Sequence, residues 1–212
     1  MMKLYGYWRS SAAFRIRIAL NLKGLRYENI PVHLVRDGGE QYKADYLALN
    51  PQGRVPTLVD GDLVLGQSMA ILEYLEERYP VPPLLPKDAG GRARARQIAL
   101  AVACDIHPLN NLRVLQFLEK TLHLPQESRD TWYHHWIRDG LTAIEKLVSP
   151  RGPYCLGDNV SIADVMLVPQ LYNAHRFNSP LDDCPRLLAI EQQCLALPAF
   201  DNALPEKQPD AG

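Results

Sequence analysis

The chain has 212 residues, with 23 lysines and arginines against 24 aspartates and glutamates. This length allows one large or two modest domains. The near-neutral charge gives no broad positive potential that would attract nucleic acid or an anionic membrane. No apolar stretch reaches membrane-spanning length and no leader pattern opens the chain, so we expect a cytoplasmic protein with no metal site, whose four scattered cysteines are free thiols.

The N-terminal segment predicts a strand followed by a helix. Residues 3–7 are short and β-prone, and the helical pattern begins at Ser10 and Ser11 and stops at Gly24. Residues 27–35 predict a second strand, parallel to the first because a helix lies between them. Two hydroxyls at a helix start lie among unpaired backbone N–H groups, where an anion is stabilised. A single serine at such a start usually only caps the helix.

A proline turn follows a polar, glycine-bearing segment, residues 36–53, which we predict to be a loop. Pro56 stands at the head of the next strand. It has either a cis bond, which would turn the backbone of Val55 outward, or an ordinary trans bond at a strand edge, and the local sequence favours neither.

A tight antiparallel hairpin is predicted around Asp60-Gly61, between two short apolar runs. Gln67 and Ser68 then open a helix, and we expect Ser68 to cap it. This order brings the proline turn and both serine-bearing helix starts to one end of the sheet. Such a place suits a tripeptide-like ligand, since the turn offers backbone bonds and a helix start can hold a carboxylate.

The domain boundary is predicted at residues 81–91, where prolines and glycines are dense. Residues 1–80 then form an α/β domain and residues 92–212 a helical domain. In the second domain, Pro108 should interrupt a helix beside His107, Asn110 and Asn111. Repair of that kink and capping by the asparagines is the structural alternative to a binding role. Farther on, Ser161 and Asp164 have the spacing of a capping box.

A family resemblance rests on motifs in both halves of the chain: SSAAFRIRIALNLKG, LNPQGRVPTL, GQSMAILEYLEE, IHPLNNLRVL, and SIADVMLVPQ ending in NAHRF. In this order they resemble the zeta class of glutathione transferases, which includes maleylacetoacetate and maleylpyruvate isomerases. The resemblance implies a thioredoxin-like N-terminal domain followed by an all-helical domain, a homodimer, and glutathione as cofactor. The implied activity is cis–trans isomerisation of a maleyl keto acid in aromatic catabolism, by thiolate addition, bond rotation and elimination.

The resemblance also implies roles for individual residues. Ser11 faces the glutathione sulfur with Ser10 beside it, and the position after them is Ala12 where relatives commonly have cysteine, so the thiol must come from the cofactor. The implied glutathione contacts are Ser10, Ser11, Val55, Gln67, Ser68, His107, Asn110 and Asn111.

Arginines are the candidates for binding a small dicarboxylate substrate, because a planar guanidinium suits bidentate carboxylate binding. Arg176 lies in the NAHRF motif, which the family places at the substrate pocket. Arg9 precedes the serine pair, although a surface ion pair would explain it equally well. Arg113 lies three residues after Asn110 on the same helical face. Several arginines in one pocket slightly favour maleylpyruvate over maleylacetoacetate, a difference of one methylene.

Two other functions fit the same residues. One is a zeta-class transferase that conjugates or dehalogenates small α-halo acids with the same thiolate. The other is a catalytically idle transferase-like domain used for assembly, against which Ser11, Gln67, Ser68 and Arg176 argue.

Overall fold

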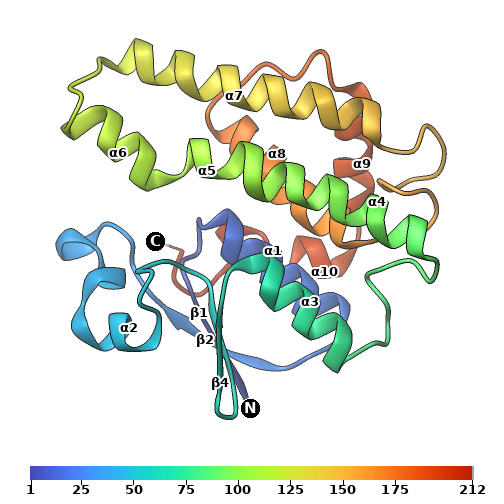
Figure 1. The fold of residues 1–212 in the computed structure, drawn as a ribbon, viewed down its shortest axis with the longest axis horizontal. Helices are drawn as coiled ribbons and strands as arrows, with labels where there is room; N and C mark the ends of the chain where they lie inside the picture. Colours follow the sequence, from blue (N-terminus) through green and yellow to red (C-terminus); the bar gives the residue numbers. More distant parts are fainter. Residues whose placement is uncertain (212) are drawn as a thin grey trace. The chain divides into compact units, whose positions relative to one another are not determined.

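The computed structural model describes residues 1–211 and divides the chain into two compact units (Figure 1). Unit 1 is formed by residues 1–83 together with the C-terminal segment from Leu195 onward, and unit 2 by residues 84–194. The sequence predicted one continuous helical domain over residues 92–212. In the structure, the end of the chain groups with the N-terminal unit instead.

Unit 1 contains a four-stranded mixed sheet with the strand order β2-β1-β3-β4. Strand β1 pairs in parallel with β2 and antiparallel with β3, and β3 pairs antiparallel with β4. This confirms the predicted strand-helix-strand unit and the hairpin, and it is the thioredoxin-like arrangement. The elements are β1 Met2–Gly6, α1 Ser11–Leu22, β2 Tyr27–Pro31, α2 Ala44–Leu49, β3 Thr57–Asp60, β4 Leu63–Gly66 and α3 Ser68–Arg78.

The prediction that residues 36–53 form a loop was wrong, because two 3₁₀ turns and the short helix α2 lie there. A six-residue helix is too short to be stable alone. Tertiary hydrogen bonds hold it: the Tyr46 hydroxyl and the Asn50 amide both donate to the backbone carbonyl of Arg54. Those partners come from the next turn of the chain, which explains why the local pattern did not reveal the helix.

Helices α1 and α3 run parallel and side by side (Figure 1). Apolar side chains with no exposed surface, including Phe14, Ile18, Ile71, Leu72 and Leu75, form this part of the core. Two side-chain hydrogen bonds join the helices, from Arg15 to Ser68 and from Lys23 to Glu76, and in each the partners lie 53 residues apart in the sequence. The equal offset means that α1 and α3 keep one register over two turns.

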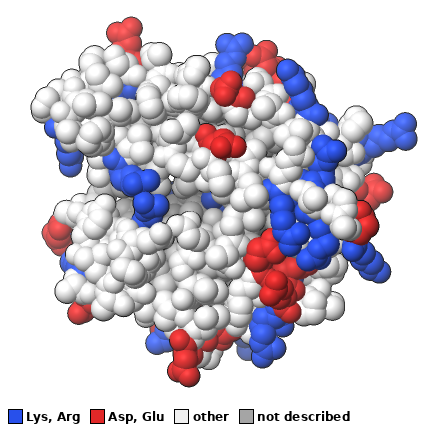
Figure 2. Space-filling model, viewed as in Figure 1, with Lys and Arg blue, Asp and Glu red and all other residues white. Residues whose placement is uncertain are grey.

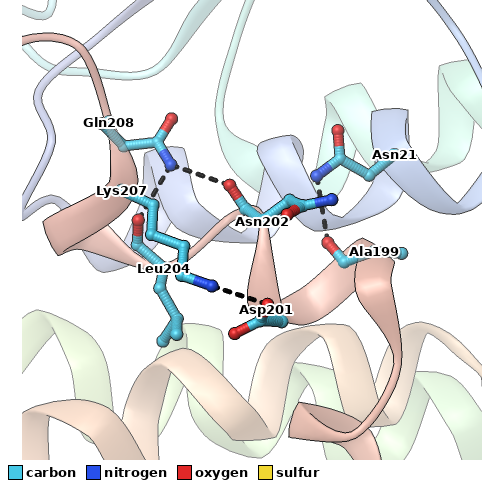
Figure 3. Close-up of polar contacts among 7 residues, drawn as sticks. All are labelled: Asn21, Ala199, Asp201, Asn202, Leu204, Lys207 and Gln208. Carbon is cyan, nitrogen blue, oxygen red and sulfur yellow. Dashed lines mark hydrogen bonds and ion pairs between the residues drawn. The ribbon is translucent and has the colours of Figure 1, made fainter.

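The C-terminal segment is fastened to α1 (Figure 3). It contains α10, Pro198–Asp201, and the 3₁₀ turn Pro205–Lys207. The Asn21 side chain donates to the carbonyl of Ala199 at 3.0 Å, and the Gln208 amide donates to the carbonyl of Leu204 at 2.8 Å. This segment therefore covers the helix that begins at the serine pair.

Unit 2 consists of helices, and the first begins inside the predicted linker. Its elements are α4 Ala89–Leu100, the π-helical segment η3 Ala101–Ile106, α5 His107–Asn110, α6 Leu112–Lys120, α7 Gln126–Leu147, α8 Ile162–Arg176 and α9 Pro185–Leu195. Asp88 caps α4 by accepting from the Gly91 amide at 2.7 Å. A Cβ on Gly91 would lie 2.7 Å from the Pro86 side chain, so this first turn requires glycine.

Two further predictions for unit 2 are confirmed. The helix is interrupted before Pro108, where η3 replaces regular α-helix. The capping box at the start of α8 is formed, because Asp164 accepts from the Ser161 amide at 2.8 Å while the Ser161 hydroxyl accepts from the Ala163 amide at 3.2 Å.

Charged side chains of both signs are interspersed on the face drawn in Figure 2, in keeping with the near-neutral composition. None of the helices in residues 1–211 combines the length and apolar character needed to cross a membrane.

Candidate active site

The two serines at the start of α1 have different positions in the helix. Ser10 is the N-cap, and its hydroxyl oxygen accepts from the Ala13 amide at 3.2 Å. Ser11 occupies the first helical position and is only 5% exposed. Because Ser10 supplies the cap, the hydroxyl of Ser11 is the one available to a ligand among the free N–H groups of the first turn.

Arg9 is held by aromatic side chains. Its guanidinium donates to the Tyr7 hydroxyl at 3.1 Å and lies 4.6 Å from the centre of the Trp8 ring. The Trp8 amide is fixed in turn by Asp210 of the C-terminal segment, at 3.0 Å. The surface ion pair that the sequence allowed for Arg9 is not found among residues 1–211. Its positive charge therefore remains available beside the serine pair.

The Val55–Pro56 bond is cis, which decides between the two alternatives left by the sequence. Side chains hold the chain on both sides of this bond. Asn50 donates to the Arg54 carbonyl and to the Thr57 hydroxyl, both at 2.9 Å, and the Tyr46 hydroxyl contacts the same two groups. Sequence reasoning missed Tyr46 and Asn50, although Asn50 lies in the LNPQG motif.

The start of α3 differs from the prediction that Ser68 is its cap, which was wrong. The N-cap is Gln67, in the left-handed region at a φ of 65°, and Ser68 is the first helical residue. The Ser68 hydroxyl instead accepts from the Arg15 guanidinium at 3.1 Å, while the Gln67 amide donates to the side chain of Gln52. Arg15 was also missed, and its signal was its position one helical turn after Ser11.

The sheet register brings these segments of unit 1 to one end of the sheet. Tyr5, near the end of β1, pairs with Thr57 at the start of β3, and Thr57 also pairs with Gly66 at the end of β4. The serine pair follows β1, the cis turn precedes β3, and the start of α3 follows β4. This confirms the predicted gathering of the proline turn and the two helix starts.

In unit 2, the predicted residues Asn110 and Arg176 contact the two members of one stacked aromatic pair, Tyr133 and Phe177. The buried Asn110 amide donates to the Tyr133 carbonyl at 3.2 Å, and the Tyr133 ring stacks on Phe177 at 4.0 Å. The guanidinium of the exposed Arg176 lies 4.9 Å from the Phe177 ring centre. Burial raises the pKa of the Tyr133 hydroxyl, and the charge of Arg176 opposes that rise. The hydroxyl therefore stays protonated.

The other predicted residues of unit 2 lie at helix starts. His107 begins α5 directly after the π-helical segment. Asn111 is the N-cap of α6 and accepts from the Arg113 amide at 3.1 Å, so the capping alternative holds for this asparagine. Arg113 is exposed, and no contact within residues 1–211 joins it to Arg176.

Family models match both units of the chain. The "Glutathione S-transferase, N-terminal domain" matches residues 1–77, and the "Glutathione S-transferase, C-terminal domain" matches residues 137–190. A "Probable maleylacetoacetate isomerase" of Vibrio cholerae is 52% identical over 98% of this chain and 97% of its own length. A "Maleylpyruvate isomerase" of Ralstonia sp. is 47% identical over 99% of this chain and 100% of its own length.

Solved structures agree with these sequence matches. A holo maleylpyruvate isomerase, described as a bacterial zeta-class glutathione transferase, superposes with a TM-score of 0.95 at 47% identity, covering 99% of this chain and 100% of its own. A maleylacetoacetate isomerase from Methylobacterium extorquens, with bound malonate and glutathione, gives a TM-score of 0.94 at 45% identity, covering 99% of each chain. The chain therefore belongs to the zeta class of the glutathione S-transferase family, with the maleylacetoacetate and maleylpyruvate isomerases.

Proposed function

We propose that this protein is a glutathione-dependent cis–trans isomerase of a maleyl keto acid, working as a homodimer in the reducing cytoplasm. The observation that carries the proposal is the gathering of two serine-bearing helix starts and a cis-proline turn at one sheet end. Relatives that carry the isomerase names match nearly the whole chain, and one was solved with glutathione and a dicarboxylate.

Glutathione fits the residues at this sheet end. It is a tripeptide with two carboxylates and a thiol, and the two helix starts offer N–H groups to anions. Beside the start of α3, the buried Nε and Nη2 of Arg15 have no acceptor within residues 1–211, which is what an anion site requires. The residues proposed to hold glutathione are Ser10, Ser11, Val55, Gln67 and Ser68 of unit 1 and His107, Asn110 and Asn111 of unit 2.

Bound glutathione supplies a thiolate that adds reversibly to the cis double bond and so permits rotation about it. The Ser11 hydroxyl and the α1 N-terminus favour the ionised sulfur, because hydrogen bonding to a charged form lowers its pKa. Arg9, Arg113 and Arg176 are the proposed partners of the substrate carboxylates and of the negative charge that develops on the substrate carbonyl oxygen.

The test is turnover of a cis maleyl keto acid with glutathione at a concentration far below that of the substrate. Isomerisation needs glutathione only in catalytic amount. Consumption of one glutathione for each substrate, or activity confined to α-halo acids, would instead make the protein a conjugating or dehalogenating transferase. Failure to bind glutathione in calorimetry would leave the assembly role.

The identity of the keto acid is proposed only as a preference for maleylpyruvate over maleylacetoacetate. The substrates differ by one methylene, which is worth about 1 to 3 kcal/mol in kcat/KM. Measuring both kcat/KM values on one preparation decides it, and a ratio that favours maleylacetoacetate would reverse the preference.

Replacing Arg176 by methionine should lower kcat/KM for the keto acid roughly 10- to 100-fold, because a charge-assisted hydrogen bond to a carboxylate is worth about 1.5 to 3 kcal/mol. The Kd of glutathione should stay unchanged. The matched control is Arg138→Met, which removes an exposed arginine paired with Asp183. Equal kcat/KM values for the two variants would remove Arg176 from substrate binding.

A further inference from the structure

A buried arginine in α1 has N–H donors for which the described residues offer no acceptor. Arg15 is only 2% exposed, and its Nη1 donates to the Ser68 hydroxyl at 3.1 Å. Its Nε and Nη2 are buried and have no acceptor within residues 1–211. A guanidinium has five N–H donors, and leaving buried donors without acceptors costs free energy. Unsatisfied groups of this kind call for an explanation in a native structure.

Among residues 1–211, no carboxylate forms an ion pair with Arg15. Burial lowers the pKa of this guanidinium to about 9, and no neighbouring acid raises it again. An uncompensated buried charge destabilises the fold. We therefore look for a binding role that explains why the charge is kept.

Arg17 on the same helix shows what a purely structural buried arginine looks like here. It is equally buried, at 2% exposure. Its Nε donates to the Ala203 carbonyl at 3.1 Å and its Nη2 to the Trp8 carbonyl at 3.0 Å. These bonds fasten α1 to the C-terminal segment and to the turn before the serine pair. Arg15, two residues earlier, has one acceptor in the part of the chain that the structure describes, the Ser68 hydroxyl.

The position of Arg15 relates it to both helix starts. It lies four residues after Ser11 and so on the same face of α1, and side chains of a helix lean towards its N-terminus. Its contact with Ser68 places its guanidinium at the first residue of α3. A cation there adds to the positive end of the helix dipole, which alone would attract an anion only weakly.

We propose that Arg15 is a ligand-binding residue that orients the Ser68 hydroxyl and reserves its remaining N–H groups for one carboxylate of glutathione. This inference rests on the proposed function. It adds the buried charge of Arg15 to the start of α3.

The test compares wild type with Arg15→Met by calorimetric titration of glutathione and of two analogues. One, γ-aminobutyryl-cysteinyl-glycine, lacks the γ-glutamyl α-carboxylate, and the other, γ-glutamylcysteine methylamide, lacks the glycyl carboxylate. Arg15→Met should bind glutathione roughly 10- to 100-fold more weakly. One of the two analogues should bind wild type much more weakly than glutathione does, but should bind Arg15→Met about as well as glutathione does. The carboxylate that this analogue lacks is the one bound by Arg15.

Stability of the ligand-free protein gives a second readout. Arg15→Met should melt at the same temperature as wild type or higher, since an uncompensated buried charge is replaced by an apolar side chain of similar length. The matched control Arg17→Met should melt lower, yet keep the wild-type ratio of affinities for the three peptides. A strong loss of stability in Arg15→Met would overturn the inference. So would a loss of affinity for both analogues, relative to glutathione, that is as large in Arg15→Met as in wild type. Wild type that binds no glutathione would overturn the proposed function, and the inference with it.

Discussion

Replacing Ser11 by alanine should lower kcat about 10²- to 10³-fold at saturating glutathione, the size of effect found when one preorganised donor to a reacting anion is removed. Ser11 occupies the first helical position and is only 5% exposed, so its side chain lies among the free N–H groups of the first turn of α1. Without it, the pKa of the bound thiol should rise towards the ordinary thiol value of about 8.5. Ultraviolet absorbance of the thiolate, followed against pH in the binary complex, measures that rise directly.

Ser10→Ala is the matched control for Ser11→Ala, because the two residues are adjacent and lose the same group. Ser10 accepts from the Ala13 amide as the helix cap, so its loss should lower the free energy of unfolding by about 1 kcal/mol and change kcat far less. The reverse result, in which Ser10→Ala loses the rate and Ser11→Ala keeps it, would exchange the roles given to the two serines.

The parts of the fold that the sequence predicted are those fixed by neighbours along the chain. The hairpin at Asp60-Gly61 and the capping box at Ser161 and Asp164 depend on residues at most three positions apart, and both formed as expected. Helix α2 depends on hydrogen bonds from Tyr46 and Asn50 to the following turn, and its local pattern gave no helix signal.

The same distinction applies to the candidate site. Ser10 and Ser11 stand at a helix start that periodicity reveals, and the cis bond at Pro56 was one of two open alternatives. Arg15 lies one helical turn after Ser11, but this spacing does not reveal that its guanidinium contacts Ser68 while that of Arg17 contacts Ala203. The contact of Arg15 lies 53 residues away and that of Arg17 lies 186 residues away. Spacing along one helix could not have supplied those distant partners.

The largest effect on stability is expected at Lys23, which ties the ends of α1 and α3. Its ammonium group has no exposed surface and donates to Glu76 at 2.8 Å and to the carbonyls of Tyr79 and Pro82 at 2.7 and 2.9 Å. An ammonium has three donors, and all three are used. Lys23→Met would remove the ammonium that lies 2.8 Å from the buried Glu76 carboxylate and would break a buried ion pair on one side only. The free energy of unfolding should therefore fall by about 3 to 5 kcal/mol.

Calorimetric melting measures this loss, with Lys3→Met as the control. Lys3 lies 4.0 Å from Glu28 with half of its side chain exposed, so its removal should change the free energy of unfolding by less than about 1 kcal/mol. Adding Glu76→Met to Lys23→Met should restore part of the loss, because the buried carboxylate that had lost its ammonium partner is then gone as well. If Lys23→Met were no less stable than Lys3→Met, the argument would be contradicted. Below the melting transition, glutathione affinity should stay within a few-fold of wild type, because the second tie of the same register, Arg15 to Ser68, remains.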